Sequence, residues 1–192
     1  MNICVFCGSS PGNDRVYMQQ AFGLGAMLAN LDIGLVYGGA NVGLMGAVAD
    51  GCLAQGGRVT GVLPHFLQAK EIAHPQLSEL VFVETMHERK IRMSEISDAV
   101  IAMPGGFGTL EELFEMLTWG QLGLHSKPVA LFNVGGFFDP LLRFVDEMVA
   151  AGFLKKVYRD LLIVSADSAA LIESIRKYEP PVVQKWITKE TT

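Results

Sequence analysis

The strongest chemical signal in the chain is the nonapeptide Pro104–Glu112, which reads PGGFGTLEE. The apolar run 99–103 before it predicts a buried strand, and apolar residues at helical spacing in 113–117 predict a helix behind it. The glycines would therefore lie at a strand-to-helix turn, where backbone amides are free and no side chains block the approach. Such a helix start binds anions, and phosphate is its usual ligand.

A purely structural explanation competes with this one. Thr109 and Glu112 have the Thr-x-x-Glu spacing of a capping box, in which the two side chains satisfy amides at the helix start. On spacing alone the capping box is the more frequent explanation. Capping does not require three glycines in four positions, however, so we expect the loop to bind a ligand even if Thr109 also caps.

Composition places these residues in one α/β domain. The chain has 192 residues, of which 50% are hydrophobic and 18% charged, so disorder and coiled coil are excluded. We expect a single nucleotide-binding domain over 1–180 and a tail over 181–192. The net charge of -5 argues against nucleic-acid binding, and the apolar runs are too short to span a membrane. No signal peptide is apparent, so the expected location is the cytoplasm.

Metal and redox chemistry receive no support from the spacing of cysteine and histidine. Cys4 and Cys7 lie in an expected strand, where alternation would put their thiols on opposite faces. The histidines are too scattered for a metal site. We therefore expect no metal and no cofactor.

The elements around the glycine loop alternate along the chain. Strands are expected at 2–7, 34–37, 58–63, 80–83, 99–103, 128–133 and 161–164. Helices are expected at 14–31, 86–97, 109–122, 139–151 and 168–178, and a further helix is expected to follow the glycine-rich segment 38–46 and end at about 54. This order predicts a Rossmann-like, doubly wound parallel sheet with helices on both faces. Ligands bind such sheets beyond the carboxyl ends of the strands. A second glycine-rich turn at 38–46 and Arg89 also follow strands, so all three can meet at that edge.

The same segments resemble the LONELY GUY (LOG) family of cytokinin riboside 5′-monophosphate phosphoribohydrolases, formerly mislabelled as lysine decarboxylases. The resemblance runs from Val5 to about Val164. It includes the segments YGG at 37–39, VGLMG at 42–46, MHERK at 86–90, PGGFGTLEE at 104–112 and TW at 118–119. Together, the nonapeptide and the upstream MHERK segment are highly specific.

The resemblance implies hydrolysis of the N-glycosidic bond of AMP or a cytokinin riboside 5′-monophosphate, giving free base and ribose 5-phosphate. It implies that Arg89 and Glu112 are catalytic. The residues it implies for substrate binding are Ser10, Gly39, Gly43, Glu71, Met86, Arg89, Lys90, Gly105, Gly106, Phe107, Gly108, Thr109, Leu110, Glu111, Glu112 and Thr118. Family members are dimers or larger, so we expect a two-fold homodimer with 86–97 and 109–122 as candidate interface helices.

The residues agree with that chemistry. Breaking a glycosidic bond passes through an oxocarbenium-like state that needs a nearby carboxylate, and Glu112 lies beside the expected phosphate loop. Arg89 could hold the phosphate or steady the developing charge. Lys90 lies about 100° round its helix from Arg89, so the two side chains do not share a face. Thr118 lies about 240° round its helix from Glu112, so these two do not share a face either.

Two other functions compete with the hydrolase. The fold also carries molybdenum cofactor in related carriers, and a phosphate loop alone would suffice for a non-catalytic carrier. A pyridoxal phosphate decarboxylase would need a Schiff-base lysine with an acidic partner for the pyridine nitrogen, and no lysine here has that setting. The choice between AMP and a prenylated nucleotide, and between hormone production and salvage, stays open.

Overall fold

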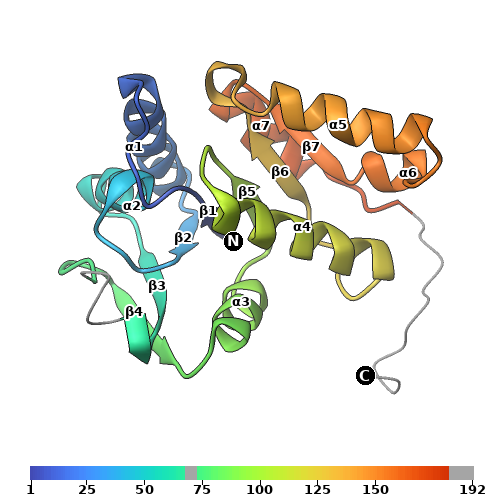
Figure 1. Cartoon of the computed structure of the whole chain (residues 1–192). Helices are drawn as coiled ribbons and strands as arrows, with labels where there is room; N and C mark the ends of the chain where they lie inside the picture. The colour runs from blue at the N-terminus through green and yellow to red at the C-terminus, as the bar shows by residue number, and fades with distance from the viewer. Residues whose placement is uncertain (68–72, 182–192) are drawn as a thin grey trace.

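A seven-stranded parallel sheet forms the centre of the protein, as the computed structural model describes it for residues 1–67 and 73–181 (Figure 1). The strand order is β4-β3-β2-β1-β5-β6-β7, and every neighbouring pair is parallel. The strands are β1 (Asn2–Phe6), β2 (Gly34–Tyr37), β3 (Val59–Pro64), β4 (Glu79–Val83), β5 (Ala99–Ala102), β6 (Val129–Phe132) and β7 (Leu162–Ser165). The predicted doubly wound fold is confirmed.

Helices follow the strands and cover both faces of the sheet. They are α1 (Arg15–Asn30), α2 (Gly43–Ala54), α3 (Met86–Glu95), α4 (Phe107–Leu122), α5 (Asp139–Ala150), α6 (Lys156–Arg159) and α7 (Ser168–Arg176). Two short 3-10 turns, η1 (His65–Leu67) and η2 (Val134–Gly136), and the four-residue α6 were not expected from the sequence. Such short turns carry too few residues to show a hydrophobic period.

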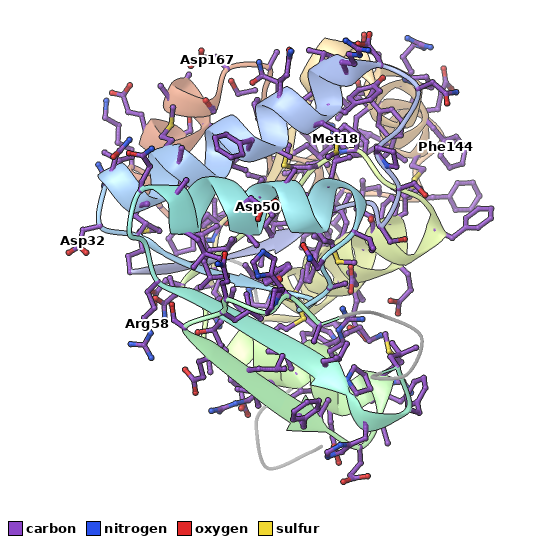
Figure 2. All side chains as sticks on the ribbon, turned by 90° about the vertical axis from the view of Figure 1, so that its left-hand side faces the viewer. Met18, Asp32, Asp50, Arg58, Phe144 and Asp167 are labelled. Carbon is purple, nitrogen blue, oxygen red and sulfur yellow. The ribbon has the colours of Figure 1, made fainter. Side chains whose placement is uncertain are left out.

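Two apolar layers hold the helices on the sheet, and β1 contributes to both. Ile3, Val5 and Cys7 pack among α1, α2 and α7, whereas Cys4 and Phe6 pack against α4 and the helices of the other face. The thiols of Cys4 and Cys7 therefore lie in opposite layers, as the alternation of a strand predicts. Figure 2 shows α1 and α2 side by side across the first face, with Asp50 on α2.

The order of the strands reverses between β1 and β5. From β1 the chain winds through β2, β3 and β4 in one direction, then returns to place β5 on the other side of β1. The segments that follow β1 and β5 thus begin side by side at the carboxyl edge of the sheet, which is the usual ligand position in this architecture.

Two limits of the described residues bear on the sequence predictions. The predicted tail lies outside them from residue 182 onward, and so does Glu71. Within residues 1–67 and 73–181, no helix combines the length and apolar character needed to cross a membrane.

Candidate active site

The turn between β5 and α4 presents an uncapped helix start. Helix α4 begins at Phe107 with Gly106 as its N-cap, and no side chain caps it. Thr109 is the third residue of the helix and is buried. The predicted capping box of Thr109 and Glu112 is therefore wrong, because the helix starts two residues before Thr109 and an N-cap must precede the first turn.

Amides at this helix start are free. In the described part of the chain, the backbone N–H groups of Phe107, Gly108 and Thr109 have no acceptor; the first bond of the turn joins Leu110 N to Gly106 O at 3.1 Å. These groups carry the positive end of the α4 dipole. The turn can therefore hold an anion with backbone donors alone.

The second glycine-rich turn has a different role. At the start of α2, the amides of Leu44 and Met45 donate to Gly8 O, at 3.0 and 3.4 Å. Gly43 has φ of +54°, and a Cβ there would lie 2.4 Å from the Ser9 carbonyl carbon. This turn thus clamps the segment after β1, which in turn bonds the β5 loop through Gly8 N and Pro104 O at 3.0 Å.

Arg89 enters the site from α3 and is held by a carbonyl of β3 and by the carbonyl of the residue after β2. Its guanidinium is buried and donates from Nε to Val62 O at 3.1 Å and from Nη2 to Gly38 O at 3.0 Å. Its Nη1 lies 3.9 Å from the Met86 sulfur. A Cβ at Gly38 would lie 2.0 Å from Nη2, so the glycine after β2 makes room for the guanidinium. Nη1 carries two N–H groups, so beside its weak contact with the sulfur it keeps one donor for a ligand.

Arg89 and the start of α4 line one cavity of about 300 Å³, which we call the central cavity. Its lining is Cys7, Gly8, Ser9, Met45, Met86, Arg89, Gly106, Phe107, Gly108, Thr109, Glu111 and Glu112. Sequence reasoning did not assign Cys7, Gly8, Ser9 or Met45 to the site, although Met45 belongs to the second glycine-rich turn and the other three directly follow β1. The strand order, which brings β1 beside β5, was the missing information.

Glu112 is the unusual ionisable group of this cavity. Burial raises the pKa of its carboxyl from 4.5 to about 7, and the nearby charge of Arg89 only partly offsets that rise. Its neighbour Glu111 raises the pKa further, whereas Lys90 lowers it. A carboxyl that changes its charge near neutral pH inside a cavity is suited to catalysis.

Comparison with known proteins finds a matching family model and similar enzymes from plants. Residues 45–175 match a family model described as "Possible lysine decarboxylase". A probable cytokinin riboside 5′-monophosphate phosphoribohydrolase of Oryza sativa subsp. japonica is 47% identical over 178 residues, covering 93% of this chain and 78% of that protein. One cytokinin riboside 5′-monophosphate phosphoribohydrolase of Arabidopsis thaliana is 43% identical over 99% of this chain and 91% of that protein. The chain belongs to the LONELY GUY family.

Solved structures share the architecture of this LONELY GUY family chain. A molybdenum cofactor carrier protein from Chlamydomonas reinhardtii superposes with a TM-score of 0.69 over 92% of this chain and 96% of that one, at 21% identity. A molybdenum cofactor binding protein from Rippkaea orientalis gives a TM-score of 0.68 at 23% identity. At this identity the likeness shows the fold alone.

The structure gathers some of the residues that the LONELY GUY resemblance implies and separates others. Those in the central cavity are Met86, Arg89, Gly106, Phe107, Gly108, Thr109, Glu111 and Glu112. Ser10 and Gly105 line an adjoining cavity of about 310 Å³, which shares Gly8, Ser9 and Gly106 with the first. Gly39 has φ of +85° and accepts from His74 N through its carbonyl at 3.0 Å, so it shapes the turn after β2.

Lys90, Leu110 and Thr118 do not line the central cavity within this chain. Lys90 Nζ is held by two glutamates of α4. Leu110 is half-buried and packs in the apolar layer beneath α4. Thr118 is exposed, donates to Phe114 O at 2.7 Å and lines a different cavity of about 120 Å³ between α4, α5 and α6. The sequence spacing already put Thr118 on another face of the helix than Glu112.

Proposed function

We propose that the protein hydrolyses the N-glycosidic bond of adenine-type nucleoside 5′-monophosphates, AMP or a cytokinin riboside 5′-monophosphate. In this reaction the bond between the anomeric carbon and the base nitrogen breaks, and water adds to that carbon. One proton of the water is released and the base nitrogen regains a proton, so the products are free base and ribose 5-phosphate. The activity for which relatives at 43–47% identity are named supports this assignment.

One observation carries the proposal: a carboxyl with a perturbed pKa, a fixed guanidinium and a free helix start share one cavity. Glu112 and Arg89 come from two different helices, α4 and α3, and both line the cavity with the amides of 107–109. A carrier needs the amides to hold a phosphate, but it has no use for a carboxylate beside the sugar. Glycosidic cleavage uses all three groups.

The geometry assigns each group a task. The amides of 107–109 would hold the 5′-phosphate, since they are free and at the positive end of α4. Glu112 lies one helical turn further, so its carboxylate would face the sugar and stabilise the oxocarbenium-like charge or activate the water. Arg89, through Nη1, would bind an oxygen of the ligand in a fixed position because its other nitrogens are engaged.

The pyridoxal phosphate alternative fits poorly with this cavity. Its lining, among the residues that the structure describes, contains no lysine to form a Schiff base. Lys90, the buried lysine that follows Arg89 in the sequence, directs its ammonium at Glu111 and Glu115. The family description as a possible lysine decarboxylase thus gains no support from the site.

The direct test is release of base from AMP by the purified protein. Adenine is measured by chromatography, and the reducing sugar is measured by a colour reaction. We expect both products in equal amounts. Isopentenyladenosine monophosphate measured beside AMP gives the preferred substrate by its kcat/KM. Stable binding of AMP with no release of adenine from either nucleotide would reject the hydrolase and favour the carrier.

A second copy of the chain is the expected partner. Several large apolar side chains are exposed, among them Phe107 at 93%, Phe153 at 87% and Phe144 at 64%; Figure 2 shows Phe144 projecting outward from the chain. Exposed aromatic side chains are typical of protein interfaces. Sedimentation at micromolar concentration should therefore give a dimer, and a species of 20.8 kDa alone would contradict the homodimer. The cytoplasmic location and the absence of nucleic-acid binding stay predictions.

A further inference from the structure

Lys90 is as buried as its neighbour Arg89, and its ammonium donates to two carboxylates of α4. Its side chain is only 7% exposed, and Nζ donates to Glu111 Oε1 at 2.5 Å and to Glu115 Oε1 at 3.0 Å. The two glutamates are four residues apart and so lie on one face of α4. Burial alone would lower the pKa of Lys90, but the two hydrogen bonds outweigh it and raise the pKa above its ordinary value.

Neighbouring residues on each helix thus have separate tasks. On α3, Arg89 turns toward the strands and the cavity, whereas Lys90, about 100° away, turns toward α4. On α4, Glu112 faces the cavity, and Glu111 and Glu115 flank it and meet Lys90. The lysine therefore bridges the two helices that carry the proposed catalytic pair, which lie one above the other in Figure 1.

We propose that Lys90 is a positioning residue: through Glu111 and Glu115 it holds α4, and with it Glu112, against Arg89, and it does not contact the substrate. This assignment differs from the substrate-binding role that the family resemblance implies for Lys90. The effect of Lys90 on catalysis rests on the proposed hydrolase function. The effect of Lys90 on the position and ionisation of Glu112 does not depend on that function.

The positive charge of Lys90 also affects the ionisation of Glu112. Glu111 lines the same cavity as Glu112, so without Lys90 its uncompensated anion would stand beside both Glu112 and an anionic ligand. The charged and titratable groups that act on Glu112 are Arg89 and Lys90 from α3, Glu111 and Glu115 from α4, and the thiols of Cys4 and Cys7 from β1. Only the two cations favour its ionised form, so loss of either one favours the protonated form.

The test compares wild type with Lys90→Met, Lys90→Arg and the exposed control Lys156→Met, whose ion pair lies on α6. Carbon NMR of protein labelled at the glutamate carboxyls follows the titration of Glu112, with Glu112→Gln identifying its signal. We expect Lys90→Met to shift that titration upward by about half a pH unit or more, because a nearby cation is lost. Lys90→Arg keeps the charge, so the titration of Glu112 should stay close to that of wild type, and Lys156→Met should leave it unchanged.

Kinetics on AMP complete the test. In Lys90→Met, kcat near pH 6.5 should fall by about 2.5-fold or more while KM changes by less than about 2-fold, and the loss should shrink at higher pH. An increased KM with an unchanged kcat and an unchanged Glu112 titration would make Lys90 a substrate contact and overturn the proposal. If Lys90→Met does not fold, Lys90→Gln removes the charge and keeps a hydrogen bond. If wild type releases no base, the hydrolase fails, yet the NMR titration still decides the role of Lys90.

Discussion

Glu112→Gln should leave the protein folded and lower its turnover of AMP by ~10²-fold or more. Glutamine has the size of glutamate but cannot carry the negative charge that an oxocarbenium-like state requires. Because no capping box involves Glu112, the substitution removes no cap from α4. AMP should still bind, since the free amides at 107–109 remain. The measurement is the release of adenine under saturating AMP, together with the affinity for AMP by calorimetry.

Stability should change in a direction that depends on pH. Burial raises the pKa of Glu112 to about 7 in the folded protein, above its ordinary value of 4.5. The carboxyl therefore stabilises the fold in its protonated form, and that contribution is lost as the pH rises through about 7. Glutamine does not ionise, so Glu112→Gln should melt at a higher temperature than wild type above pH 7 and show no such gain near pH 5.

The control for both measurements is Glu147→Gln. Glu147 is an exposed glutamate on α5 and does not line the central cavity. It should match wild type in turnover and in melting temperature at each pH. Wild-type activity in a folded Glu112→Gln protein would remove the carboxylate from the mechanism. The remaining amide-lined cavity would then fit a carrier better than a hydrolase.

The fold could be predicted from local sequence patterns, because each strand and each long helix has its own hydrophobic period. The boundary of α4 could not. Thr109 and Glu112 have the spacing of a capping box, but Phe107 and Gly108 already belong to the helix. Glycine at the N-cap permits that earlier start without a side-chain cap. The spacing of two side chains thus did not determine where the helix begins.

The site was predictable in its parts and not in its connections. Nothing in the order of residues says that Gly38 must be small because the Arg89 guanidinium lies against it, since that contact depends on β2 and β3 being neighbours of α3. The same holds for Lys90, whose ion pairs join residues more than twenty positions apart. Long-range side-chain pairing is decided by the three-dimensional packing, and a single sequence carries only the periodicity of each element.

Adenosine should be a far poorer substrate than AMP, with kcat/KM lower by orders of magnitude. If the amides of Phe107, Gly108 and Thr109 bind the 5′-phosphate, a nucleoside without that group loses several charge-assisted hydrogen bonds. Each contributes about 1.5–3 kcal/mol, so two of them alone correspond to a loss of about 10²-fold or more. The loss should appear in kcat/KM, because without the phosphate the sugar is no longer held beside Glu112. Adenine release from both compounds, measured at equal concentrations well below KM, gives the ratio directly.

Competition by inorganic phosphate separates this explanation from a general preference for charged ligands. Phosphate occupies the helix start that AMP needs, so it should inhibit AMP hydrolysis competitively; chloride at the same ionic strength should not. Gly108→Pro removes one of the three free amides, and proline is tolerated in the first turn of a helix. This variant should weaken phosphate inhibition and AMP turnover while the rate on adenosine stays near its low wild-type value. Equal kcat/KM for AMP and adenosine in the wild type would instead mean that the start of α4 does not bind the phosphate.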